Sequence, residues 1–169
     1  MNRVEQMREH INVMLATKKD AEDKRVAYLH LYGVAFACAL IAKKRKANVE
    51  LAVMAGMLHD LYSYKKKDEV NHDPKKVPAI LANHAKDGAV FTRELLNEWQ
   101  LTTPEETDAI CTAIYNHSDK HGKFAELDEI LIDADVLQHC LYNPAFPVAK
   151  HEESRFNKLM QEFGIESRG

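Results

Sequence analysis

Hydrophobic residues recur every three or four positions along most of this chain, and few stretches alternate with a period of two. Spacing of this kind is typical of amphipathic helices that bury one face. No internal repeat, low-complexity tract or long linker interrupts the pattern. We therefore predict an all-α, single-domain helical bundle. The predicted helices cover residues 2–16, 21–45, 49–62, 78–99, 104–117, 126–141 and 149–163.

Capping residues and prolines set the predicted ends of these helices. Asn48 is a suitable N-cap, and residues 103–106 combine a capping box with proline at the first helical position. Residues 63–77 are polar and contain proline, so we predict a loop there. Pro144 and Pro147 are expected to end the sixth predicted helix.

The composition is that of an ordinary globular protein, and it excludes some classes of function. The 169 residues are 46 % hydrophobic and 29 % charged, and 23 basic against 26 acidic residues give a net charge of −3. Because basic residues are not in excess, we do not expect the protein to bind duplex nucleic acid. Three cysteines lie far apart without a CxxC pair, which argues against a disulfide framework or a thiolate zinc site. With no apolar signal core at its start, we expect a cytoplasmic protein.

One stretch is apolar enough to raise the question of a membrane span. Residues 26–42 contain no Asp, Glu, Lys or Arg. This run of 17 residues is shorter than the about 20 that cross a bilayer, and it includes His30 and Gly33. We predict a buried core helix and no membrane association.

Six polar residues lie on or beside the hydrophobic faces of five predicted helices. Alone, each has a structural explanation, as a core histidine bonded to a carbonyl or as an aspartate that caps a helix. Together they are costly to bury without a common partner. One or two bound divalent cations would satisfy all of them. The six residues are His30, His59, Asp60, His84, His117 and Asp135.

The donor atoms of this set favour a transition metal. Four imidazoles and two carboxylates without sulfur suit Fe, Mn, Co, Ni or Zn, and they are too rich in nitrogen for a calcium site. Because neighbouring helical residues diverge by about 100°, Asp60 can bridge two ions while His59 binds one. His139 lies one turn from Asp135, and its role stays open. The remaining histidines lie in polar contexts and are expected to be solvated; they are His10, His72, His121 and His151.

These residues resemble the HD-domain superfamily of metal-dependent phosphohydrolases. The likeness rests on His30, on His59-Asp60 within Ala-Gly-Met-Leu-His-Asp-Leu, and on Ala-Asp-Val at 134–136. It spans about residues 25–140. A His-Asp dipeptide alone has no diagnostic value, whereas this ordered set on the expected helices is fairly specific.

Two further histidines resemble those of the six-ligand, two-metal branch of that superfamily. They are His84, within Asn-His-Ala-Lys-Asp-Gly-Ala, and His117, within Ala-Ile-Tyr-Asn-His-Ser. Within this branch the chain is most similar to small bacterial single-domain members, including the symmetrical diadenosine tetraphosphate hydrolases. We accordingly expect one HD-type domain over residues 1–169. Its core would cover about 20–141, with an N-terminal helix and a C-terminal segment packed on it.

The resemblance implies a role for each of the six residues. His30, His59, Asp60 and Asp135 would hold the first metal. The second metal would be held by Asp60 together with the two additional histidines, His84 and His117. Asp60 and a water or hydroxide would then bridge the ions, with Asp60 and His59 as the catalytic residues. Iron is the first candidate among the metals, and Mn, Co, Ni and Zn are alternatives.

Cations near these segments are candidates for binding substrate phosphates. Arg25, Lys65 and Lys120 each lie within a few positions of a predicted ligand, although solvated surface charge is the alternative for each. The dinucleotide hydrolases place a lysine three or four residues after the His-Asp pair, whereas here Leu61-Tyr62-Ser63-Tyr64 precedes Lys65. They also have threonine where this chain has Ser118.

Residues and resemblance together predict hydrolysis of a phosphate ester or anhydride in a nucleotide-like small molecule by a metal-activated water. Two other functions use the same ligands. One is a di-iron oxygenase, and the other is a non-catalytic nucleotide-binding module in which the metal is structural. Residues 63–77 form either a lid or a simple loop. Residues 142–169 either complete the bundle or mediate formation of a homodimer.

Overall fold

The structure, a computed structural model, describes residues 2–142 and 148–165, and it confirms the predicted all-α fold. No strand occurs within these two ranges. Pro144 and Pro147, the predicted helix breakers, lie outside the described residues. The described helices are α1 (Arg3–Ala16), α2 (Ala21–Arg45), α3 (Val49–Leu58), α4 (Leu61–Glu69), α5 (Val77–Trp99), α6 (Pro104–Asn116), α7 (Glu126–Tyr142) and α8 (Glu153–Phe163).

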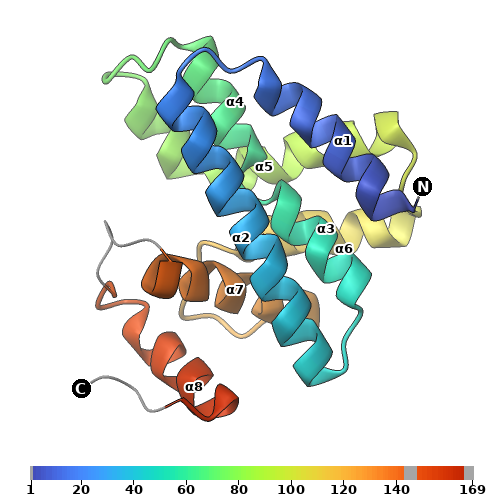
Figure 1. Cartoon of the computed structure of the whole chain (residues 1–169), viewed down its shortest axis with the longest axis vertical. Coiled ribbons are helices and arrows are strands. Elements are labelled where there is room, and N and C mark those ends of the chain that lie inside the picture. Colours follow the sequence, from blue (N-terminus) through green and yellow to red (C-terminus); the bar gives the residue numbers. More distant parts are fainter. Residues whose placement is uncertain (1, 143–147, 166–169) are drawn as a thin grey trace.

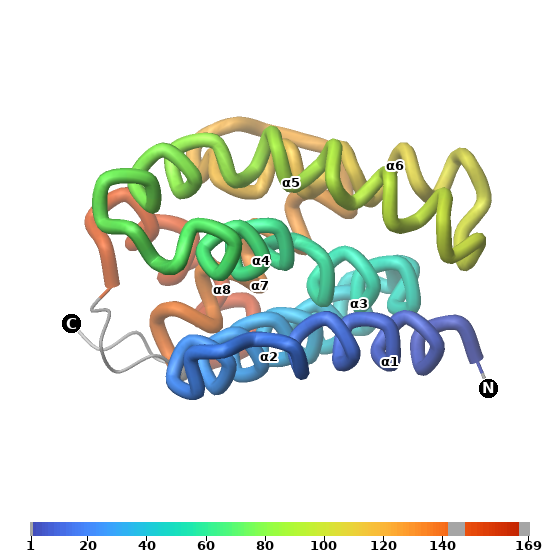
Figure 2. Tube along the Cα trace, turned by 90° about the horizontal axis from the view of Figure 1, so that it is seen from above, coloured from blue at the N-terminus to red at the C-terminus, as the bar shows by residue number. Residues whose placement is uncertain are grey.

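The helices are stacked in layers. Figure 2 shows α1 and α2 along one side of the molecule, α5 and α6 along the opposite side, and α3 and α4 between them. α2 packs mainly on α3 and α7, while α5 packs mainly on α6 and α4. α8 packs on α7, next to the lower part of α2 in Figure 1. α3 is the centre of this arrangement, because it also contacts α6 and buries six of its ten residues.

α2 has one buried and one exposed face. It is long and apolar enough to cross a membrane by length and composition alone, but half of its most apolar window is buried inside the protein. The buried side faces α3 and α7, as expected for a core helix. The opposite side exposes four large apolar residues, Val26, Leu29, Phe36 and Leu40.

Charged side chains tie the first and last helices to this core. Arg3 of α1 donates hydrogen bonds to Glu106 at 2.6 and 2.9 Å and to Glu50 at 2.7 Å. Arg45, at the end of α2, donates to Glu162 of α8 at 2.7 and 3.0 Å. These contacts hold α1 against α3 and α6, and α8 against α2.

The prediction of a loop over 63–77 is wrong for its first half, which is helical. The third helix ends at Leu58, four residues earlier than predicted, and α4 begins at Leu61. α4 buries only a narrow strip that includes Tyr64, and lysines make up much of its remaining surface. Lysine and glutamate favour helices as well as solvent, so a charged run does not by itself indicate a loop. α8 likewise begins four residues later than predicted.

Gly56 is required where α2 and α3 approach each other. A Cβ atom at this position would lie 2.7 Å from Ala35 Cα and 2.9 Å from Ala35 N. Because these are backbone atoms, the two helices would have to move apart. We expect Gly56→Ala to lower the free energy of unfolding by roughly 1–3 kcal/mol, the usual cost of overpacking. Chemical denaturation would measure this loss.

Gly88→Ala provides a matched control within α5. A Cβ atom there would meet its nearest neighbour, the carbonyl oxygen of His59, at 3.5 Å, which is an ordinary contact. Alanine in a helix interior is favoured over glycine by about 0.5–1 kcal/mol, so this variant should be neutral or slightly more stable. Equal stability of the two variants would contradict a close approach at Gly56.

Candidate metal centre

Six polar side chains from different helices converge between the layers of the fold. They are the six residues that the sequence singled out because they interrupt apolar helix faces. Two of them, at the α3–α4 junction, are adjacent in the chain. The structure places His30 in α2, His59 and Asp60 at that junction, His84 in α5, His117 at the end of α6 and Asp135 in α7.

The first group consists of His30, His59, Asp60 and Asp135. The Nε2 atoms of His30 and His59 are 3.0 Å apart, and His30 Nε2 lies 3.4 Å from Asp60 Oδ2. Both Nε2 atoms lie 3.7 Å from Asp135 Oδ1. Atoms bound at about 2.0–2.2 Å to one ion lie roughly 3–4.4 Å from each other, so His30, His59 and Asp60 are spaced as ligands of a single cation. Asp135 lies at a similar distance from both histidines.

The second group consists of His84, His117 and the other oxygen of Asp60. The Nε2 atoms of His84 and His117 are 3.1 Å apart, and they lie 3.7 and 3.8 Å from Asp60 Oδ1. Asp60 therefore directs one carboxylate oxygen to each histidine pair. The bridging role predicted for Asp60 would use these two oxygens.

Hydrogen bonds fix the tautomer of all four histidines. In each ring, Nδ1 lies within hydrogen-bond distance of a carbonyl oxygen, which can only accept, so Nδ1 carries the proton. His59 and His117 directly follow α3 and α6, where the last carbonyl groups of a helix lack amide partners. The pairs are His30 with Gln138 Oε1 (3.0 Å), His59 with Gly56 O (2.8 Å), His84 with Leu81 O (2.6 Å) and His117 with Ile114 O (2.6 Å).

These tautomers leave a lone pair on every Nε2 atom. In the His30–His59 pair and the His84–His117 pair, two such atoms face each other at 3.0 and 3.1 Å. Two acceptors repel at this distance unless a proton or a metal ion lies between them. Asp60 Oδ1 is also buried, and none of the described residues forms a hydrogen bond with it. The donor set therefore fits divalent cations, because metal-bound histidines commonly donate from the second nitrogen to a carbonyl or carboxylate.

The electrostatics of the region favour an ionised Asp60 and a neutral His117, whereas they favour the protonated form of His30. Burial disfavours the charged form of Asp60, but the imidazoles of His59 and His30 outweigh burial and hold the pKa of this carboxyl well below its usual range. Burial lowers the pKa of His117 to about 4, so this ring is neutral at neutral pH. Burial alone would lower the pKa of His30, but Asp60 and Asp135 raise it above its ordinary value.

Lys120 is buried beside the centre and contacts both groups. Its Nζ atom donates to Asp135 Oδ2 at 2.7 Å and to the carbonyl oxygen of His117 at 2.9 Å. The alternative of a solvated surface charge is therefore wrong for Lys120. Burial opposes the ionisation of Asp135, but the Lys120 ammonium outweighs it, and the pKa of Asp135 lies well below its usual range.

Among the described residues, Gln138, Ser118 and His139 also border the centre, and the sequence assigned none of them to it. Gln138, one turn after Asp135 on α7, orients His30, and its position on the same helix face was the available signal. Ser118 Oγ lies 3.0 Å from His84 Nε2. His139, whose role the sequence left open, has its Nε2 atom 3.5 Å from Asp135 Oδ1.

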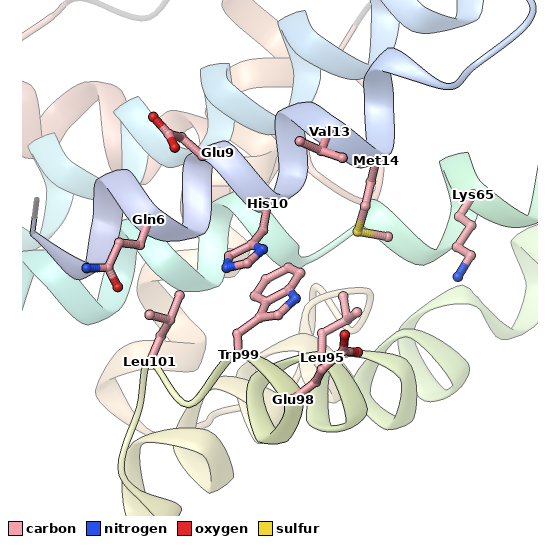
Figure 3. Close-up of a pocket in the computed structure, with 10 residues that line it drawn as sticks. All are labelled: Gln6, Glu9, His10, Val13, Met14, Lys65, Leu95, Glu98, Trp99 and Leu101. Atoms are coloured by element: carbon pink, nitrogen blue, oxygen red, sulfur yellow. The ribbon is translucent and has the colours of Figure 1, made fainter.

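Arg25 and Lys65, the other two predicted phosphate contacts, lie elsewhere among the described residues. Arg25 is exposed on α2, and its Nε atom donates to Glu22 at 2.9 Å. Lys65 Nζ lies 4.8 Å from the ring centre of Phe91. Figure 3 shows Lys65 at one end of a groove of about 670 Å³ whose lining residues include none of the six. The described contacts of these two side chains do not include the centre.

The four histidines predicted to be solvated are all exposed, which confirms that prediction. His10 stacks on Trp99 in the groove of Figure 3, with ring centres 4.7 Å apart. His72 Nε2 lies 3.2 Å from Asp68 Oδ1. Neither histidine contacts the centre in the described part of the chain.

One comparison with known proteins gives a match. The model of the HD domain family matches residues 27–139, which are 113 of the 169 residues. All six residues of the centre lie within the matched range. No curated protein and no solved structure was found to match the chain.

Proposed function

Since the chain belongs to the HD domain family, which consists largely of metal-dependent hydrolases, we propose that it hydrolyses a phosphate ester or anhydride of a nucleotide-like substrate. We assign it to the six-ligand branch of that superfamily, with His30, His59, Asp60 and Asp135 around one ion. His84, His117 and Asp60 surround the other. The symmetrical hydrolysis of dinucleoside polyphosphates is the activity to test first.

The observation that supports this proposal most strongly is the position of Asp60. Its two oxygens point to two separate histidine pairs, and one of these oxygens is buried without a hydrogen-bond donor. A single structural metal would need only one of the pairs. Two adjacent cation sites with a shared carboxylate are the arrangement found in hydrolytic two-metal centres.

When bound, divalent cations would supply Lewis-acid activation of water and charge neutralisation of the phosphoryl group. The residues of the chain prepare the site for this chemistry. Asp60 and Asp135 contribute two negative charges, and the Nδ1 hydrogen bonds hold four imidazoles with their lone pairs inward. The exposed Ser118 hydroxyl beside His84 is placed to donate a hydrogen bond to a phosphoryl oxygen.

Metal analysis of anaerobically purified protein, combined with a substrate screen, tests the proposal. We expect up to two transition-metal ions per chain, with iron as the first candidate. Phosphate or nucleotide should be released from nucleotides or dinucleoside polyphosphates without oxygen. Oxygen consumption that accompanies turnover would indicate a di-iron oxygenase instead. Tight nucleotide binding without turnover under any metal would indicate a regulatory module, and either result would contradict the proposal.

A further inference from the structure

We propose that the exposed face of α2 is the interface of a homodimer in which two copies of α2 pack antiparallel. Four large apolar side chains follow one another at steps of three, seven and four residues, so they share one side of the helix. Isolated exposed apolar residues are ordinary, but a continuous row indicates an interaction site. We call this row the α2 stripe. Its four residues are Val26 (37 % exposed), Leu29 (57 %), Phe36 (61 %) and Leu40 (42 %).

The spacing of the α2 stripe is self-complementary. Val26 and Leu40 each lie seven residues from Gly33, and Leu29 and Phe36 lie four and three residues from it. If a twofold axis passes near Gly33, Leu29 of one copy faces Phe36 of the other, and Val26 faces Leu40. The same patch on both copies then forms the contact, as in most homodimers. Gly33 itself is half-buried, and a Cβ atom there would lie 3.1 Å from Gln138 Cγ of α7, so it marks the midpoint of the stripe without adding a side chain to it.

The charges at the two ends of the stripe favour the antiparallel orientation. Glu22 and Lys44 both are exposed, and each lies eleven residues from Gly33 on opposite sides. In an antiparallel pair, Glu22 of each copy lies near Lys43 and Lys44 of the other. A parallel pair would instead place these two lysines against their counterparts. Arg25 already contacts Glu22 along the same helix, so we expect the added attraction to be modest.

The α2 stripe is accessible to a second copy. Figure 2 shows α1 and α2 forming one outer side of the molecule, and Figure 1 shows α2 crossing in front of the other helices over its whole length. A bilayer is a poorer partner than a second copy. An anionic lipid surface would attract the lysine end of α2 but repel Glu22. Binding to a lipid surface also does not require apolar residues spaced symmetrically about Gly33, whereas a twofold contact does.

Sedimentation equilibrium of the full chain over a wide concentration range tests the proposal. We expect a reversible dimer, and we expect Phe36→Glu to weaken it by at least about tenfold because the new charge would be desolvated in the interface. Val13→Glu is the matched control, since Val13 is a 68 % exposed valine on α1, outside the stripe. Circular dichroism establishes that both variants are folded.

A charge exchange tests the orientation independently of Phe36. Glu22→Lys and Lys44→Glu should each weaken the dimer, whereas the double variant should restore it because both pairs are then reversed. A wild-type chain that stays monomeric, or equal dissociation constants for Phe36→Glu and Val13→Glu, would overturn the proposal. Two additive losses in the double variant would overturn the antiparallel arrangement. Binding of a monomeric wild type to anionic phospholipid vesicles would assign the stripe to a membrane.

Discussion

Replacing Asp60 by asparagine is expected to abolish hydrolysis while the protein stays folded. Asparagine keeps the shape of the side chain, but it has only one acceptor oxygen and no negative charge. It can therefore serve one histidine pair and not both. We expect the bound metal to fall to one ion per chain or fewer, and turnover to fall by more than ~1,000-fold, which corresponds to about 4 kcal/mol.

The fold should tolerate this change because Asp60 contributes little to packing. Its side chain is 21 % exposed, and among the described residues Oδ1 has no hydrogen-bond donor. The change therefore removes only the attraction of the carboxylate to the neighbouring imidazoles, among them His59 and His30. Thermal unfolding of metal-free protein would measure this directly. Asp87→Asn on α5 is the control, since Asp87 accepts a hydrogen bond from the Tyr62 hydroxyl at 3.3 Å and lies outside the centre. Undiminished turnover in the Asp60 variant would refute the proposed function.

The described helices other than α4, and the six candidate ligands, were predictable because two strong physical constraints act on them. A helix has a fixed period, so apolar residues at that period reveal the buried face without knowledge of the partner helices. Burial of an imidazole or a carboxylate is costly, so six of them on buried faces indicate a shared partner. Neither constraint requires distances, and the structure supplies these, such as the 3.0 Å between His30 and His59.

Contacts between distant residues were not predictable in the same way. Gln138 and His30 are 108 positions apart, and only the packing of α2 on α7 brings them together. Lys120 lies in a connection after α6, where no periodicity shows which way a side chain points. Proximity in sequence placed Arg25 near His30, but Arg25 lies on an exposed face of the same helix. Sequence neighbours on one helix can face opposite directions, so closeness along the chain is weak evidence for a shared site.

Replacing Lys120 by methionine is expected to weaken metal binding and destabilise the metal-free protein. Methionine fills similar space, but it leaves Asp135 Oδ2 without its 2.7 Å partner and the carbonyl of His117 without its donor. Loss of a partner that orients a ligand typically lowers metal affinity by about 10–100-fold. Removal of one member of a buried ion pair costs about 3–5 kcal/mol. Metal titration and chemical denaturation would measure the two effects.

The pH dependence of this loss follows from the low pKa of Asp135. A carboxyl group whose pKa is lower in the folded state stabilises the fold above its unfolded pKa of about 3.9, and this stabilisation is lost as the pH falls through the folded pKa. The wild type and Lys120→Met should therefore differ most at neutral pH and converge in acid. Lys123→Met, an exposed lysine in the same connection, should show neither effect. A higher KM for substrate with unchanged metal affinity and stability would instead identify Lys120 as the phosphate contact that the sequence suggested.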